Sequence, residues 1–244
     1  MISTLSKINK TLSASDKSSN IQFNAALPIS ITVLERLEMD RYTLLLGNRK
    51  FKTKSQKKLR SGAKYWGNFG ESKDGIITIS GLLEKPSLFQ DGVHFLPFEY
   101  QEFMQKLIKQ TDAMRVFKEW LIDNLADKNT DRANFMILSD MLLALQKNIF
   151  HLPLMGDSKP FLIQFQAYTN ELEFYLAHEN LGPLKGFLIQ TKETSSLRLE
   201  VFFEKTLYFL QQEFDKINLQ ADLQIKKNIS PLYDKNMLTL DLQC

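Results

Sequence analysis

Positive charge is concentrated between Asn48 and Lys64. This stretch contains no acidic residue and eight cationic ones: Arg49, Lys50, Lys52, Lys54, Lys57, Lys58, Arg60 and Lys64. Phe51 lies within the stretch, and Tyr65 and Trp66 follow it directly. Cations that attract phosphates, together with aromatic rings that stack on bases, are the usual means of binding single-stranded nucleic acid. One hypothesis for residues 49–60 is therefore a nucleic-acid surface.

Two other interpretations of the same residues stay open. Lys50, Lys52 and Lys54 alternate with Phe51, as on a strand with one face in solvent. Lysines on such a strand discourage pairing with the edge of another sheet. The surface would then have no ligand, or it would bind an acidic partner other than nucleic acid.

Residues for metal binding or catalysis are sparse. Cys244 is the only cysteine, and His94, His151 and His178 are far apart in the chain. None of the sequence motifs of zinc proteases, serine hydrolases, nucleotide-binding loops or dinucleotide-binding folds is present. We therefore expect a protein that is not an enzyme and has no cofactor and no metal.

The composition is that of a globular protein with a substantial core. The chain has 244 residues, of which 43% are hydrophobic and 24% charged, and 18 are phenylalanine. Residues 1–97 contain 15 Lys and Arg against 8 Asp and Glu, whereas residues 152–244 contain 9 against 12. No apolar stretch reaches the roughly 20 residues that a membrane span requires. These features predict a soluble, cytoplasmic protein with modules of different charge.

The front of the chain is predicted to contain a disordered leader and a small β-barrel. Residues 1–25 hold six serines and one acidic residue, which favours disorder. Residues 26–86 read as about five short strands, the size of an OB-like or SH3-like barrel. The pair Gly47-Asn48 between two strand-like runs predicts a hairpin with a type II′ turn.

The rest of the chain is predicted to contain a helical segment followed by a domain of strands and one helix. Together with the strands of residues 26–86, this predicts the α+β fold class. Residues 98–150 have helical periodicity, with helices over 98–110, from the N-cap Asp112, and from Asp131. Residues 151–244 predict a compact α+β domain: strands at 161–165, 172–176, 186–190, 197–203, 222–226 and 237–242, and one helix at 204–217. Between His178 and Phe187 the residues Leu181-Gly182-Pro183-Leu184 predict an exposed turn.

Residues 150–228 resemble the C-terminal domain of flagellar hook-length control proteins. The features that carry the resemblance are a Leu152-Pro153-Leu154 start, two strands, the turn at Leu181-Gly182, a strand pair, a leucine-rich helix and a final strand. The region before it also resembles the β-rich segment that precedes this domain in some members. Members that measure hook length have a longer stretch before this domain, so the chain resembles a short or divergent member.

The resemblance implies a role in flagellar type III export by protein–protein contact. The expected partner is the cytoplasmic domain of an export-gate switch protein, and the expected contact residues are Leu181, Gly182, Pro183, Leu184 and Phe202. The protein would be cytoplasmic and would itself be a candidate for export. Two roles stay open: the protein could measure hook length, or it could be an accessory of the export switch. The alternatives are a nucleic-acid-binding protein that uses the basic barrel, and a structural adaptor.

Overall fold

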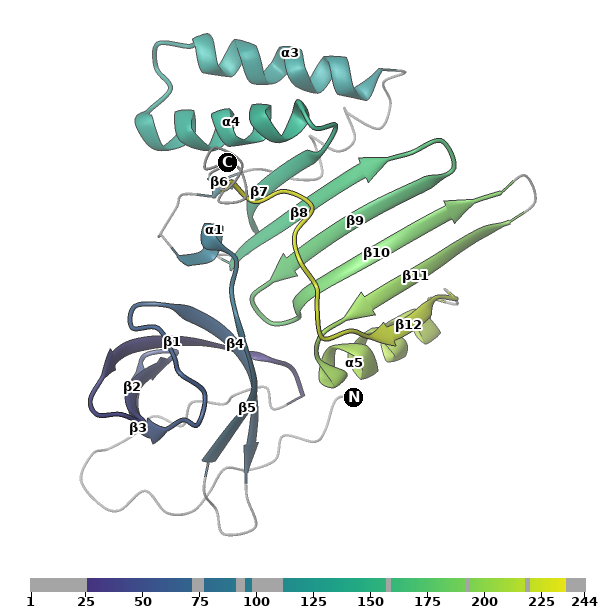
Figure 1. Ribbon diagram of the computed structural model, residues 1–244. Helices are drawn as coiled ribbons and strands as arrows, with labels where there is room; N and C mark the ends of the chain where they lie inside the picture. The colour runs from purple at the N-terminus through teal and green to yellow at the C-terminus, as the bar shows by residue number, and fades with distance from the viewer. Residues whose placement is uncertain are drawn as a thin grey trace, which may run out of the picture. The chain divides into compact units, whose positions relative to one another are not determined.

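The computed structural model describes residues 26–71, 77–90, 95–97, 112–156, 159–191, 194–217 and 220–235. This part of the chain contains two β-sheets and four helices, with more strand than helix (Figure 1). The prediction of a mixed α and β protein is therefore confirmed. The chain divides into two compact units, the first ending at Glu84 and the second beginning at Lys85.

The first unit is a five-stranded antiparallel sheet with strand order β3-β2-β1-β4-β5. The predicted hairpin is present, since Leu46 pairs with Arg49 across the two residues Gly47 and Asn48. Gly47 has φ = 58°, the positive value that the first position of a type II′ turn requires. The strands are β1 (Ile29–Arg36), β2 (Arg41–Leu46), β3 (Arg49–Lys54), β4 (Lys64–Glu71) and β5 (Ile77–Glu84).

One face of this sheet surrounds a core of its own. Period-two alternation on β1 buries Ile29, Ile31 and Val33, and Leu59 from the β3–β4 loop joins them. A closed barrel, however, is not formed by the described strands, because β3 and β5 are the two ends of the sheet order. The predicted barrel is thus found as a five-stranded sheet around a core, without pairing between its ends.

The second unit contains a seven-stranded sheet with order β12-β11-β10-β9-β8-β7-β6. The five central strands form an antiparallel meander, and the two outermost strands pair parallel to their neighbours. The strands are β6 (Leu96–Pro97), β7 (Phe150–Gly156), β8 (Lys159–Ala167), β9 (Glu171–His178), β10 (Gly182–Gln190), β11 (Ser195–Val201) and β12 (Asp222–Ile225). A short helix, α1 (Ser87–Gln90), precedes β6.

Helices α3 (Ala113–Ala126) and α4 (Arg132–Leu145) form a hairpin on one end of this sheet (Figure 1). Their predicted starts are confirmed: the carboxylates of Asp112 and Asp131 each accept a backbone N–H of the first turn. Phe117 of α3 stacks on Phe150 of β7 at 5.1 Å between ring centroids. The helical segment expected at 98–150 therefore shares a core with the strands that follow it.

Helix α5 (Glu204–Lys216) packs on the other end of the same sheet face. The strand register aligns Phe165, Phe174, Gly186, Leu199 and Leu223 in one row across β8 to β12. Aligned residues of neighbouring strands lie on the same face. Phe165 packs against the α3–α4 core and Leu199 against α5, so the two helical layers cover the two ends of one face.

The opposite face of the sheet is crossed by residues 226–235, here named the C-terminal strap. Figure 1 shows the strap in yellow, running from β12 across the sheet towards β7. Gln164 of β8 points to this face, between Ile163 and Phe165, which point to the helices. The strap is thus the second cover of the sheet.

Several predictions concern residues outside the described part of the chain: the leader 1–25, the helix at 98–110 and the strand at 237–242. Strand β7 was not predicted, and it contains Pro153, a residue that is unusual in the interior of a strand. No helix in the described ranges has the length and apolar character needed to cross a membrane.

Candidate functional site

The residues Leu181 to Leu184 do not form the predicted exposed turn. The turn between β9 and β10 consists of Glu179, Asn180 and Leu181, and β10 begins at Gly182. Gly182, Pro183 and Leu184 are buried, with Leu184 only 5% exposed. The predicted turn was therefore too long, and three of its residues belong to the core.

The physical reason lies in the contact between Gly182 and Phe203. Gly182 has φ = 73°, and a Cβ atom at this position would lie 2.5 Å from the Phe203 ring. Glycine is thus required by packing as well as by the backbone conformation. The hydroxyl of Thr206, in the first turn of α5, donates a hydrogen bond of 2.6 Å to the carbonyl oxygen of Leu181. These contacts fix the β9–β10 turn against the start of α5.

Two of the predicted contact residues remain accessible. Leu181 and Phe202 are half-buried, and together they are named the turn site. The Phe202 ring packs edge-on against the buried Phe203 ring, with centroids 4.8 Å apart. A half-buried aromatic residue held by a buried one is a suitable anchor for a protein contact, because little side-chain freedom is lost on binding.

The basic run of the first unit presents a row of exposed lysines on β3. Lys50, Lys52 and Lys54 are exposed on one face of β3. Phe51 points to the opposite face and packs on the core, while Tyr65 and Trp66 are buried. The structure therefore agrees with the interpretation of these lysines as the solvent face of one strand, and it separates them from the rings that the nucleic-acid hypothesis requires.

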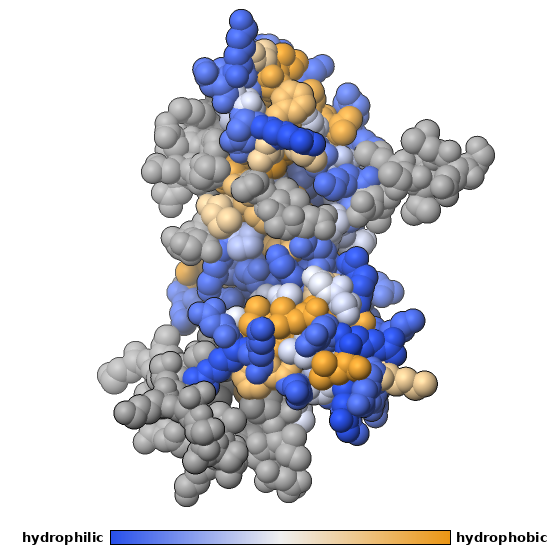
Figure 2. All heavy atoms as spheres, turned by 90° about the vertical axis from the view of Figure 1, so that its left-hand side faces the viewer, coloured by the Kyte–Doolittle hydropathy of each residue, from blue (hydrophilic) through white to orange (hydrophobic). Residues whose placement is uncertain are grey.

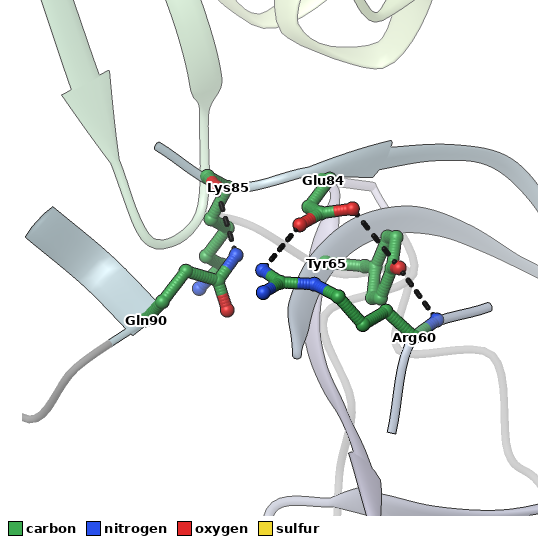
Figure 3. Close-up of polar contacts among 5 residues, drawn as sticks. All are labelled: Arg60, Tyr65, Glu84, Lys85 and Gln90. Atoms are coloured by element: carbon green, nitrogen blue, oxygen red, sulfur yellow. Dashed lines mark hydrogen bonds and ion pairs between the residues drawn. The ribbon is translucent and has the colours of Figure 1, made fainter. Parts of the chain in front are cut away.

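Two other cations of the run have partners within the first unit. Arg60 forms an ion pair of 2.6 Å with Glu84, and Tyr65 donates a hydrogen bond to the same carboxylate (Figure 3). The ammonium of Lys57 donates to the carbonyl of Leu82 at 2.9 Å. Burial raises the pKa of Tyr65, which keeps its hydroxyl protonated as the donor. Figure 2 shows hydrophilic side chains together with patches of hydrophobic ones on the visible face of this unit, in the lower half of the view.

Sequence reasoning missed a buried polar cluster between the C-terminal strap and the sheet. At its centre, Gln164 Oε1 accepts the backbone N–H groups of Leu232 and Tyr233, at 2.8 and 3.2 Å. Its Nε2 donates to the Tyr233 carbonyl at 2.7 Å and contacts His151 Nδ1 at 2.8 Å. Because Nε2 is a donor, Nδ1 accepts, and the proton of the neutral imidazole lies on Nε2.

The electrostatics of this cluster favour neutral groups. Burial, with a smaller contribution from the charge of Lys235, lowers the pKa of His151 to about 3. Burial and the carboxylates of Asp140 and Asp234 raise the pKa of Tyr233 to about 12. Lys235 approaches Asp140 at 3.7 Å, which ties the strap to α4. A cavity of ≈ 20 Å³ adjoins these groups.

The arrangement is suited to holding the strap rather than to catalysis. Ser87 donates to Asp234 of the strap at 3.2 Å, and no contact joins its hydroxyl to His151 in the described structure. A serine nucleophile would need such a base within hydrogen-bond distance. No sequence signal pointed to this cluster, because a glutamine that alternates with apolar residues on a strand normally faces solvent.

Comparison with known proteins yields no relative: no family model, no curated protein and no solved structure matches this chain. Within the described ranges, no group of three or more His, Cys, Asp or Glu side chains could hold a metal ion. The candidate functional surfaces are therefore the turn site of the second unit and the lysine row of the first.

Proposed function

We propose that this protein is a non-enzymatic factor of flagellar type III export, similar to hook-length control proteins. It would act in the cytoplasm, or on its way through the export channel, by contact with the cytoplasmic domain of an export-gate switch protein. The proposal rests on the resemblance of residues 150–228, and the order of elements in this region supports it.

The supporting observation is the succession β10, β11, α5 and β12. The resemblance implies a Leu-Gly turn, a strand pair, a leucine-rich helix and a final strand, in that order. Leu181 immediately precedes β10, which begins at Gly182. Leu207 and Leu210 of α5 pack against β10 and β11. Strand β12 then pairs parallel to β11. A compact unit of this kind offers a preformed surface for a protein partner.

The contact surface that we propose is the turn site, Leu181 and Phe202. The originally expected Gly182, Pro183 and Leu184 would contribute by holding these two residues in place. Leu184→Asp is consequently expected to disrupt folding, since it would place a charge in the core next to Val201.

The experiment is a binding assay between the full chain and the purified cytoplasmic domain of the export-gate switch protein. The proposal predicts a complex that survives gel filtration or is captured in a pull-down. The absence of binding to this domain and to the other export components would contradict the proposed function.

The principal alternative is a nucleic-acid-binding protein that uses an OB-like barrel in the first unit. The sheet around a core and the row of lysines favour it, whereas the burial of Tyr65 and Trp66 weighs against it, because stacking supplies much of the affinity for single strands. A structural adaptor without either activity is the third hypothesis.

A further inference from the structure

The lysine row of the first unit coincides with an open sheet edge. Strand β3 is the last strand of the order β3-β2-β1-β4-β5 and pairs only with β2 among the described strands. Lys50, Lys52 and Lys54 all lie on it, with exposed side chains. An edge strand offers unpaired backbone groups to another extended chain.

The register of the hairpin decides which backbone groups face outward. In a hairpin with a two-residue loop, the residues that flank the loop, Leu46 and Arg49, form a hydrogen-bonded pair. Hydrogen-bonded and non-hydrogen-bonded pairs then alternate along the ladder. Lys50, Lys52 and Lys54, paired with Leu45, Thr43 and Arg41, are the non-hydrogen-bonded positions. Their N–H and C=O groups therefore point to the open edge.

The same three residues thus provide both the free backbone groups and the positive charge. Their side chains repeat every second residue on one face, at roughly 6.6 Å. An added strand has the same repeat, so acidic side chains at every second position would lie beside the lysines. The residues opposite the lysines on β2 include no acid, so the charge of the row is not cancelled by its cross-strand neighbours.

We propose that β3 binds an extended peptide with acidic side chains at alternate positions, by addition of a strand to this edge. Backbone hydrogen bonds to Lys50, Lys52 and Lys54 supply affinity, and the ammonium groups select the acidic pattern. The same row disfavours pairing with a second copy of β3, since lysines would then lie beside lysines.

The experiment measures fluorescence anisotropy of a labelled nine-residue peptide in which Glu and Thr alternate, titrated with the full chain. A control peptide has the same composition with its glutamates contiguous, and an oligothymidylate serves as the nucleic-acid probe. We expect the alternating peptide to bind more tightly than both. Charge reversal by Lys50→Glu, Lys52→Glu and Lys54→Glu together is expected to abolish binding.

A matched pair of variants separates backbone pairing from charge. Lys52→Gln and Lys52→Pro both remove one charge, but only proline removes the outward N–H, and it breaks no hydrogen bond to β2. We expect Lys52→Gln to weaken binding a few-fold, through the lost charge. Lys52→Pro should weaken it by about fivefold to tenfold more, the effect of one additional lost hydrogen bond. Circular dichroism checks that both variants keep the fold, and Lys50→Pro is a second proline variant with the same expectation.

Three results would overturn the proposal. Equal affinity of the two Lys52 variants for the peptide would exclude strand addition. Equal affinity of the protein for the two peptides would mean that the lysine row binds polyanions regardless of how their charges are spaced. Tighter binding of the oligothymidylate would favour the nucleic-acid alternative.

Discussion

Gln164 is hydrogen-bonded to both backbone groups of Tyr233. Its side-chain oxygen accepts the Tyr233 N–H, and its side-chain nitrogen donates to the Tyr233 carbonyl. A glutamine amide thereby pairs with the C-terminal strap as a neighbouring strand would, although the strap crosses the sheet face. This pairing accounts for the complete burial of a polar side chain in β8, because all four of its hydrogen-bonding positions are occupied.

Gln164→Glu should loosen the strap without changing the size of the side chain. The carboxylate cannot donate, so the Tyr233 carbonyl and His151 Nδ1 would lose their partner. Each buried polar group left without a hydrogen-bond partner lowers the free energy of unfolding by about 1–3 kcal/mol. Chemical denaturation should show the loss of stability, and hydrogen exchange should show faster exchange of the Leu232 and Tyr233 amides. Unchanged exchange at these two amides would mean that Gln164 does not hold the strap.

Buried His151 should make the stability of the second unit depend on pH. Its pKa is lowered to about 3 in the folded protein, from the ordinary value of 6.5. Between these two values the unfolded chain binds a proton that the folded chain does not, so stability falls as the pH falls below 6.5. From pH 7 to pH 5 the contribution of this group should decrease by about 2 kcal/mol.

The control for this pH dependence is His151→Gln, which removes the titrating group. The difference in unfolding free energy between pH 7 and pH 5 should be smaller in this variant than in the wild type by the same amount. His178→Gln is a second comparison, since His178 is only half-buried. An identical pH dependence of wild type and His151→Gln would contradict the buried, neutral histidine.

Gly186 lies under the ring of Phe174 in the middle of β10. A Cβ atom at Gly186 would lie 2.0 Å from this ring, so Gly186→Ala must displace it. Overpacking of this kind typically costs about 1–3 kcal/mol. Thermal or urea denaturation should show the loss, and Phe174→Leu should reduce it in the double variant. If the two substitutions are simply additive, the contact does not determine the choice of glycine.

Much of the second unit followed from local patterns in the sequence. The starts of α3 and α4 at Asp112 and Asp131, the helical period of α5 and the strands β8 and β9 are each encoded within a few residues, and each was predicted. The same holds for the type II′ turn at Gly47 in the first unit. Such elements are predictable because their hydrogen-bonding partners and apolar faces are set by near neighbours.

The errors arose where a residue's role depends on distant parts of the chain. Gly182 was placed in an exposed turn, yet it is a strand residue that gives space to the Phe203 ring. Gln164 looks like a solvent-facing residue until the strap, nearly 70 positions later, covers it. Sequence spacing does not carry these long-range contacts.

The central proposal is that the turn site binds the cytoplasmic domain of an export-gate switch protein. Calorimetric titration of this domain with the full chain and two charge-introducing variants tests it most directly. Phe202→Asp alters the turn site, and Leu188→Asp introduces the same charge at an apolar residue, 39% exposed, towards the opposite end of β10. With circular dichroism confirming folded variants, the proposal predicts binding by wild type and Leu188→Asp, and an affinity about 30-fold lower for Phe202→Asp, as for a lost anchor residue. Equal affinity of all three proteins would exclude the turn site, and no binding by the wild type would contradict the proposed export function itself.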